Sequence, residues 1–256
     1  MARARHYLMV AAPITSVRTP PLLEAWFAAR GIPARCDVRH VELADLDALM
    51  DEVRADETLD GLMVSMPLKR AMLPLLDSVS ETARAVGSVN AVKRVGARGL
   101  VGDQFDGIAL ARAVAARGVD LAAARVTLAG VGGAGLAIAL AFAEAGCTAL
   151  TLVDTEHGRL AEAAALLKRP PSMLAPGDPR PAADILINAT PLGMAADDPS
   201  PFSAEEVGAA ALVADIVAVP NETRLADLAR TMAVPLVSGY DMVTFQIDPI
   251  GAFLTS

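Results

Sequence analysis

The chain has 256 residues, long enough for two compact domains, and 54% of them are hydrophobic while only 4% are aromatic. The 22 lysines and arginines are outnumbered by 30 aspartates and glutamates, which gives a net charge of −8. This charge argues against binding of nucleic acid or of an anionic membrane, so we expect the partner to be a small molecule. We also expect the protein to be a monomer or homodimer.

The first half of the sequence alternates apolar segments of strand length with helix-like segments. The strands are expected at residues 7–12, 34–41 and 59–65, the helices at 20–30, 43–55 and 80–86, and a hairpin turning at 96–98 is expected within 88–101. Such alternation is typical of the α/β class.

The second half repeats strand and helix more regularly. A helix at 108–117 is expected to connect two domains, and the final helix, 245–254, is expected to return to the first half. Between them we expect strands at 125–130, 148–154, 185–190, 211–218 and 235–239, and helices at 131–146, 159–168 and 223–232. The proline-rich segment 169–184 is expected to be a loop with a short strand around Met173 and Leu174.

The cysteine pattern and the N-terminus suggest a cytoplasmic protein. Cys36 and Cys147 belong to no CxxC pattern, so neither a disulfide framework nor a metal site is predicted, and both thiols are expected to be reduced and buried. The first apolar run, Tyr7 to Ala12, has the length of a strand rather than of a signal peptide. No uninterrupted apolar stretch is long enough for a membrane span.

A glycine-rich turn follows the strand expected at 125–130. Gly130, Gly132 and Gly135 have the GxGxxG spacing and, with Gly133 and Ala134 between them, open an alanine-rich helix. The spacing alone is a weak signal, but a strand before it and a helix after it are what dinucleotide binding requires. Backbone N–H groups at the start of such a helix attract the pyrophosphate. These five residues are therefore candidate cofactor-binding residues.

Asp154 ends the next expected strand, 154 − 135 = 19 residues after the last glycine. An acid at this place accepts hydrogen bonds from the ribose hydroxyls and repels a 2′-phosphate. The alternative is an aspartate that caps the next helix. Arg159 is a candidate cofactor contact or a solvated helix residue. The balance favours NAD over NADP.

Seven segments, taken in order along the chain, resemble motifs of the shikimate/quinate dehydrogenase family. They are PITSVRTP (13–20), VSMPLK (64–69), AVGSVNAV (85–92), GDQFDG (102–107), GVGGAG (130–135), NATPLGM (188–194) and GYDMVTFQ (239–246). Each segment alone is weak, whereas the ordered set spans nearly the whole chain. The resemblance implies an α/β fold of two domains with a cleft between them. These are an N-terminal α/β catalytic domain, about 1–106 completed by 237–256, and a Rossmann NAD-binding domain, about 107–236.

The resemblance implies that Lys69 and Asp106 are the catalytic pair. The chemistry agrees, because oxidation of a secondary alcohol requires the hydroxyl proton to leave, and a lysine–aspartate pair can orient the hydroxyl and move that proton. The alternative for Lys69 is a solvated lysine that follows a strand. The sequence leaves open which of the two residues carries the proton.

The resemblance also assigns binding roles. Asn90 and Gln246 match residues that bind ring hydroxyls, and Thr19 and Ser65 match part of the hydroxyl cluster that holds the substrate carboxylate. Three further positions match residues beside the cofactor, namely Thr190, Ile216 and Gly239. Each has an ordinary alternative: Asn90 as a turn residue, Thr19 as a helix cap, Gln246 as a surface amide.

Several positions depart from the family pattern. Val17 replaces the first serine of the paired-serine motif and Met63 replaces an asparagine, while Ala218 falls where the family has a tyrosine. Gln104 and Phe105 replace an asparagine and a threonine. A site that binds a carboxylate discriminates less well between substrates when it loses polar partners for that group. We therefore expect a paralogue of the biosynthetic shikimate enzyme, with an altered carboxylate pocket.

The sequence therefore predicts an NAD-dependent oxidoreductase that interconverts a secondary alcohol and a ketone on a cyclic polyhydroxylated substrate. The first alternative is a true quinate or shikimate dehydrogenase that tolerates Val17 and Met63. The second is a non-catalytic NAD-binding regulator, against which the retention of both Lys69 and Asp106 argues.

Overall fold

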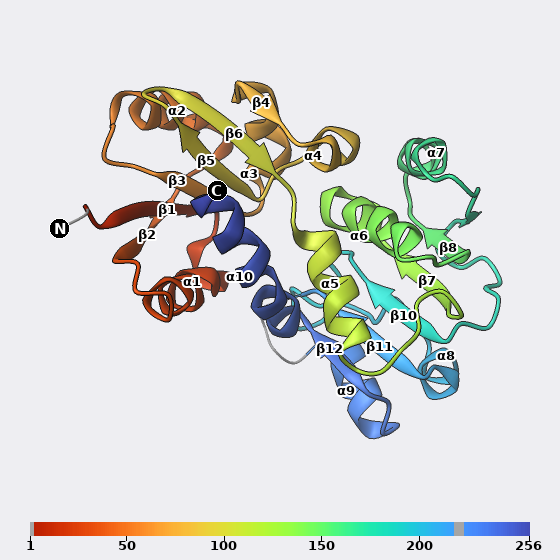
Figure 1. Ribbon diagram of the computed structural model, residues 1–256. Helices are drawn as coiled ribbons and strands as arrows, with labels where there is room; N and C mark the ends of the chain where they lie inside the picture. The colour runs from red at the N-terminus through yellow and green to blue at the C-terminus, as the bar shows by residue number, and fades with distance from the viewer. Residues whose placement is uncertain (1–2, 218–222) are drawn as a thin grey trace. The chain divides into compact units, whose positions relative to one another are not determined.

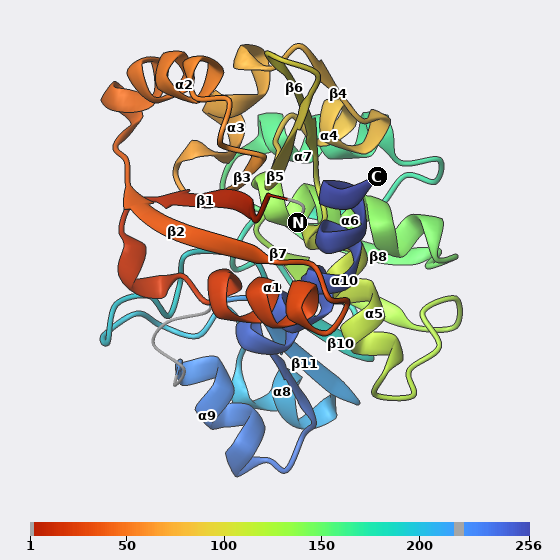
Figure 2. The ribbon, with the colours of Figure 1, turned by 60° about the vertical axis from the view of Figure 1, so that its left-hand side comes forward.

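The computed structural model describes residues 3–217 and 223–256 (Figures 1 and 2). The chain divides into two units, one formed by Met1–Phe105 with Val243–Ser256 and the other by Asp106–Met242. Each unit contains a six-stranded sheet with helices packed against it. The predicted α/β class is confirmed.

The sheet of the first unit has the order β2-β1-β3-β5-β6-β4. Strands β1, β2 and β3 are parallel to one another. Strands β5 and β6 form the predicted antiparallel hairpin, and β5 also pairs antiparallel with β3. The strands are β1 (Arg5–Ala11), β2 (Ala34–His40), β3 (Gly61–Val64), β4 (Ser78–Val79), β5 (Ala91–Val95) and β6 (Gly99–Asp103). The α-helices are α1 (Thr19–Ala28), α2 (Leu46–Ala55), α3 (Leu68–Met72) and α4 (Glu81–Val86), with most of α10 (Gly239–Thr255).

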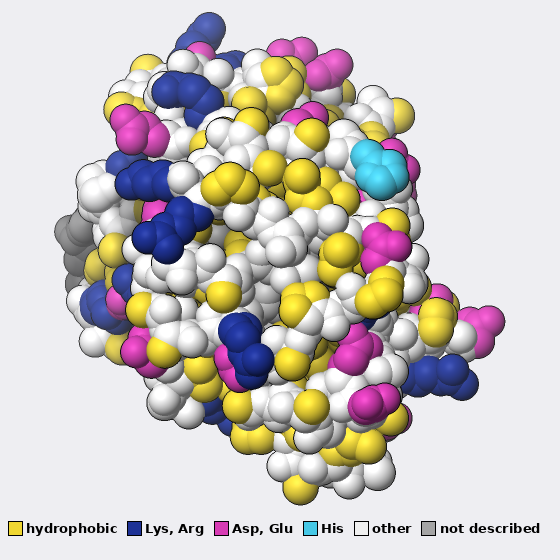
Figure 3. All heavy atoms as spheres, turned by 90° about the vertical axis from the view of Figure 1, so that its right-hand side faces the viewer, with side chains coloured by type: hydrophobic (Ala, Val, Ile, Leu, Met, Phe, Trp, Pro, Cys, Tyr) yellow, Lys and Arg dark blue, Asp and Glu magenta, His cyan; other side chains and the backbone are white. Residues whose placement is uncertain are grey.

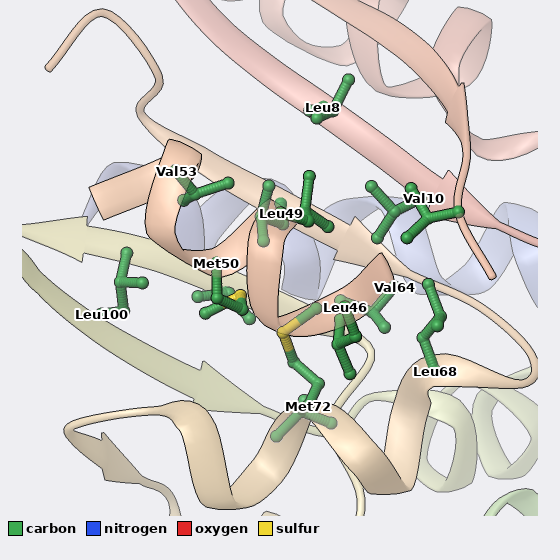
Figure 4. Packing of buried hydrophobic residues seen from close by; sticks show 14 of the residues in the cluster. Leu8, Val10, Leu46, Leu49, Met50, Val53, Val64, Leu68, Met72 and Leu100 are labelled. Carbon is green, nitrogen blue, oxygen red and sulfur yellow. The ribbon is translucent and has the colours of Figure 1, made fainter. Parts of the chain in front are cut away.

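Both faces of this sheet are covered. Leu62 and Val64 of β3 belong to a hydrophobic cluster with residues of α2 and α3 (Figure 4). Met63, which points to the opposite face because side chains alternate along a strand, packs in a second cluster with residues of α1 and α10. All four residues of β3 are buried. The strand is thus fixed from both sides, and so is the point at which the chain leaves it.

The second unit has a parallel sheet in the order β12-β11-β10-β7-β8-β9. Read from the β9 end, this is the 3-2-1-4-5-6 order of a Rossmann fold. The strands are β7 (Arg125–Ala129), β8 (Ala149–Val153), β9 (Ser172–Leu174), β10 (Ile185–Asn188), β11 (Leu212–Asp215) and β12 (Leu236–Ser238). The helices are α5 (Asp106–Ala115), α6 (Gly133–Glu144), α7 (His157–Leu166), α8 (Ala204–Ala209) and α9 (Arg224–Thr231).

Four elements differ from the sequence prediction. Helix α3 and strand β4 lie in a segment for which no element was predicted. Helix α8 was not predicted either, although Ser203 and Glu206 form a complete capping box at its start. Helix α10 begins at Gly239, six residues before the predicted start, and includes Pro249. Among the described residues, no helix is long and apolar enough to cross a membrane.

Candidate active site

Three candidate residues, Val17, Thr19 and Ser65, follow two neighbouring strands of the first unit. Strands β1 and β3 are parallel partners, so the segments after them leave from the same edge of the sheet. The Ser65 N–H donates to the Val10 carbonyl at 3.0 Å, which ties the two segments together at this edge. Thr19 is buried as the first residue of α1, and Val17 and Ser65 are half-buried.

Lys69 lies in the first turn of α3 rather than directly at a strand end. Its side chain is half-buried, so it differs from the fully solvated lysine of the alternative interpretation. Its backbone carbonyl accepts a hydrogen bond from the Val89 N–H at 3.0 Å. This bond holds α3 against the segment that carries Asn90.

Asn90 is buried and connects three parts of the first unit. Its carbonyl accepts from the Val64 N–H at 2.9 Å, and its own N–H donates to the Asp103 carbonyl at 3.0 Å. Its side-chain Oδ1 accepts from the Phe105 N–H at 2.9 Å, directly before Asp106. Asn90 is therefore an ordered link between the end of β3 and the chain that leads to Asp106, not a simple turn residue.

The other departures from the family pattern are mostly packed into the interior. Met63 is 1% exposed and packs in the cluster with residues of α1 and α10, so the expected alteration of the carboxylate pocket does not rest on this residue. Gln104 is buried and donates from Nε2 to the Ser88 hydroxyl at 3.0 Å. Phe105 packs against Phe253, with ring centroids 5.5 Å apart. Val17 is half-buried and packs against the cluster that contains Met63.

The structure describes one of the two further predicted positions. Gln246 is 6% exposed in the first half of α10, so it is not a surface amide. Ala218 lies outside the described residues.

Asp106 is the first residue of α5 and is 1% exposed. The next residue, Gly107, faces helix α6 at very short range, because a Cβ added there would lie 2.1 Å from the Ala137 carbonyl oxygen. Only glycine permits this approach of α5 to α6. The close packing fixes the start of α5 and, with it, the position of Asp106.

Replacement of Gly107 by alanine should therefore displace Asp106. We expect Gly107→Ala to reduce turnover by about ten- to hundredfold, since small displacements of catalytic groups are costly, and to destabilise the protein by about 1–3 kcal/mol through overpacking. Gly158→Ala is the matched control, because a Cβ at Gly158 meets no atom within 4 Å. Turnover and thermal unfolding measure both effects, and normal turnover in Gly107→Ala would contradict this role.

The glycine-rich turn of the second unit has two kinds of glycine. Gly130 has φ +88°, and a Cβ there would lie 2.7 Å from the Ala189 backbone. A Cβ on Gly135 would lie 2.0 Å from the Gly130 carbonyl oxygen. At Gly132, the residue that precedes α6, a Cβ meets no atom within 4 Å. Two of the glycines thus permit close packing, while the third leaves space beside the helix N-terminus, where a pyrophosphate fits.

Asp154 is buried and directed toward this turn. Its Oδ2 accepts from the Val131 N–H at 2.7 Å, and its Oδ1 accepts from the Glu156 N–H at 2.9 Å. The guanidinium Nη1 of Arg159, whose side chain is 48% exposed, lies 3.8 Å from Oδ1. Asp154 thus supports the glycine-rich turn and also contacts the residue before α7, so its capping role and its predicted cofactor role are compatible.

The remaining cofactor candidates follow β10, β11 and β12. Thr190 and Ile216 lie just beyond the paired residues Asn188 and Asp215, and Gly239 begins α10 directly after β12. The Ile216 N–H donates to the Asn188 carbonyl at 3.1 Å. Asn188 and Asp215 were not among the predicted site residues, although each is a polar residue at the end of an apolar strand, which is a signal for such a site.

Other reactive groups offer no competing centre in the parts of the chain that the structure describes. Burial raises the pKa of the Cys36 thiol to about 12 and also raises that of Cys147, so neither is an activated nucleophile. Within residues 3–217 and 223–256 no group of three or more histidine, cysteine, aspartate or glutamate side chains is arranged to hold a metal ion. On the face shown in Figure 3, lysine and arginine side chains are interspersed with acidic ones.

The chain is similar in sequence to shikimate dehydrogenases. A family model described as the shikimate dehydrogenase substrate binding domain matches residues 9–92. A Rhodospirillum rubrum protein named shikimate dehydrogenase (NADP(+)) is 34% identical over 259 residues, which covers 96% of this chain and 90% of the relative.

Solved structures extend the similarity over both units. The ligand-free form of 5-ketofructose reductase from Gluconobacter sp. strain CHM43 is 28% identical, with a TM-score of 0.83 over 98% of this chain and 92% of that one. Quinate dehydrogenase from Corynebacterium glutamicum, in complex with NAD, is also 28% identical, with a TM-score of 0.83 over 98% of this chain and 94% of that one.

Proposed function

The chain belongs to the shikimate dehydrogenase family of oxidoreductases, and from this premise we propose that it interconverts a secondary alcohol and a ketone on a cyclic polyhydroxylated substrate, with NAD as its cofactor. In this proposal the unit formed by residues 1–105 and 243–256 binds the substrate, and the unit formed by residues 106–242 binds the dinucleotide. The observation that carries the proposal is the retention of Lys69 and Asp106, both in ordered settings, together with a complete dinucleotide turn.

The chemistry divides between the cofactor and the protein. When bound, the nicotinamide ring exchanges a hydride with the carbon that carries the hydroxyl group. Lys69 and Asp106 orient that hydroxyl, and one of them takes its proton as the ketone forms. Asn90 and Gln246, both buried amides, bind ring hydroxyls, and Thr19 and Ser65 supply further hydroxyl contacts.

Several residues of the second unit fit the dinucleotide. The open space at Gly132 and the N–H groups of Gly133, Ala134 and Gly135 receive the pyrophosphate. Asp154 accepts hydrogen bonds from the ribose hydroxyls, while Thr190, Ile216 and Gly239 line the nicotinamide end. A non-catalytic regulator needs the dinucleotide residues but not the proton-transfer pair, so the presence of both sets favours the enzyme.

The preference for NAD rests on Asp154. A buried carboxylate beside the ribose repels a 2′-phosphate, and the quinate dehydrogenase of similar structure was solved with NAD. The Rhodospirillum rubrum relative is named for NADP(+), and Arg159, 3.8 Å from Asp154, is the residue that would neutralise a phosphate in this chain.

Asp154→Ala should reduce the preference for NAD over NADP. We expect NAD to bind about ten- to hundredfold more weakly, because a charge-assisted hydrogen bond contributes about 1.5–3 kcal/mol, while NADP binding should weaken less. Arg159→Ala is the matched variant, and it should weaken NADP without weakening NAD. Steady-state kinetics with both dinucleotides measure this, and faster turnover of the wild-type protein with NADP at equal concentrations would contradict the assignment.

The altered carboxylate pocket rests on Val17. An apolar side chain where the family has a serine removes one polar partner for a carboxylate, and the similar 5-ketofructose reductase is named for a ketosugar without a carboxyl group. We therefore place the substrate among cyclic polyols with a smaller or less charged substituent than shikimate.

Val17→Ser should raise kcat/KM for shikimate or quinate relative to the native substrate, by about tenfold for one regained hydrogen bond to a charged group. Met63→Asn is unsuitable as a companion because it would bury an amide in the core. A panel of shikimate, quinate and cyclitols, each with NAD and NADP, tests the function as a whole. A high kcat/KM of the wild-type protein on shikimate would favour the alternative that it is a true quinate or shikimate dehydrogenase. The absence of turnover with every compound would favour the alternative that it is a non-catalytic NAD-binding regulator.

A further inference from the structure

A buried polar cluster lies at the carboxyl ends of β10 and β11. Asn188, Asp215 and Thr223 are 0%, 3% and 4% exposed, respectively. Their polar atoms are hydrogen-bonded to one another and to nearby backbone. Burial of polar groups opposes folding unless each is paired, and apolar side chains would fill the same space. The cluster therefore calls for an explanation other than core stability.

The side chain of Asn188 sets the conformation of the loop that follows β10. Its Nδ2 donates to the Leu192 carbonyl at 2.9 Å and to Asp215 Oδ1 at 3.1 Å. Its Oδ1 accepts from both the N–H and the hydroxyl of Thr190, at 3.0 and 2.6 Å. The same hydroxyl oxygen accepts from the Leu192 N–H at 3.1 Å. Thr190 is thus held in one orientation by Asn188.

Asp215 extends this control to the chain beyond β11. Its Oδ1 also accepts from the Val217 N–H at 3.2 Å, and its Oδ2 accepts from the Thr223 hydroxyl. Thr223 in turn caps α9 by accepting from the Ala226 N–H at 3.0 Å. Gly193, with φ +103°, packs on Thr223, since an added Cβ would lie 2.8 Å from its Cγ2. Burial raises the pKa of Asp215, and its three hydrogen bonds oppose that shift.

The sheet order says which part of a dinucleotide these loops face. The glycine-rich turn follows β7, and Asp154 follows β8 on one side of it. An acid at that place contacts the ribose of the adenosine half. Strands β10 and β11 lie on the other side of β7, so Thr190 and Ile216, which follow them, are on the side of the nicotinamide half.

We propose that Asn188 and Asp215 are positioning residues that hold Thr190 and Ile216 in the arrangement that receives the nicotinamide end of the dinucleotide. This inference rests on the proposed dinucleotide function. The hydrogen bonds of the cluster go to the residues that follow β10 and β11, whereas the glycine-rich turn meets this region through the packing of Gly130 on Ala189. The cluster should therefore affect the nicotinamide half of the dinucleotide much more than the adenosine half. Comparison of NADH with ADP-ribose, which lacks the nicotinamide ring, separates the two halves.

The test measures the binding of NADH and of ADP-ribose to the whole protein by calorimetry. Asp215→Leu, which removes the acceptors, should weaken NADH by about tenfold or more and leave ADP-ribose within about twofold of the wild type. Asp215→Asn keeps one acceptor oxygen and adds an N–H group that can donate to the Thr223 oxygen. It should therefore retain most of the NADH affinity that Asp215→Leu loses. If Asp215→Leu does not fold, Thr223→Val should shift the NADH to ADP-ribose ratio in the same direction by about two- to fivefold.

Three results would overturn the proposal. They are equal weakening of NADH and ADP-ribose, wild-type NADH binding in the variants, and an Asp215→Asn variant as impaired as Asp215→Leu. A wild-type protein that binds neither NADH nor NADPH would instead contradict the proposed function. If the wild type prefers NADPH, the comparison uses NADPH and 2′-phospho-ADP-ribose.

Discussion

Lys69→Ala should slow turnover by about 10²- to 10⁴-fold, the usual size of a lost general acid–base contribution, while the fold and dinucleotide binding stay intact. The side chain is half-buried on α3, and the strand before it is packed from both faces, so its removal leaves no large cavity. The glycine-rich turn and Asp154 belong to the other unit. Circular dichroism, dinucleotide titration and steady-state kinetics measure the three quantities.

The adjacent exposed Arg70 offers a matched control for Lys69, since Arg70→Ala removes a neighbouring positive charge from the same helix. It should leave turnover within about twofold of the wild type, because surface charges have small effects. Near-normal turnover in Lys69→Ala would mean that this lysine is not catalytic. Equal losses in both variants would point to α3 rather than to the lysine.

Gly132→Val should reduce dinucleotide affinity by more than about a hundredfold without unfolding the protein, because the side chain would occupy the place of the pyrophosphate. The structure separates binding from stability here. Gly132 has φ −71° and ψ −165°, an extended conformation open to other residues, and a Cβ there meets no atom within 4 Å. Thermal unfolding should therefore be nearly unchanged while the titration with NADH is lost.

Gly135→Ala is the contrasting variant. Its Cβ would lie 2.0 Å from the Gly130 carbonyl oxygen, so we expect a lower unfolding temperature together with weaker binding. Tight dinucleotide binding in Gly132→Val would mean that the pyrophosphate does not lie beside this glycine.

The elements that were predicted correctly are those whose sequence pattern and structure are both local. The GxGxxG spacing, the strand before it and the helix after it are all local, and β7, α6 and Asp154 have the predicted order. The β5–β6 hairpin was found from its turn. Helix α3 was missed because it has only five residues and follows a proline, so no apolar periodicity marks it.

The features of the site that the sequence did not show have a different cause, since they depend on contacts between distant segments. Met63 belongs to a strand whose four residues are all buried, so the sequence does not show whether its side chain faces a pocket or the core. The bond from the Phe105 N–H to Asn90 joins residues 15 apart in the chain. The Asn188–Asp215 contact spans 27 residues and requires knowledge that β10 and β11 are neighbours in register.

The most direct test of the central claim is a double-mutant cycle on kcat with Lys69→Ala, Asp106→Asn and the combined variant. If the two residues act on one proton transfer as a unit, each single variant slows turnover strongly, and the double variant loses much less than the product of the two single losses. One of the single variants should also lose a limb of the pH profile of kcat/KM. Losses that multiply fully, or an Asp106→Asn variant with normal turnover, would contradict the assignment of Lys69 and Asp106 as a catalytic pair.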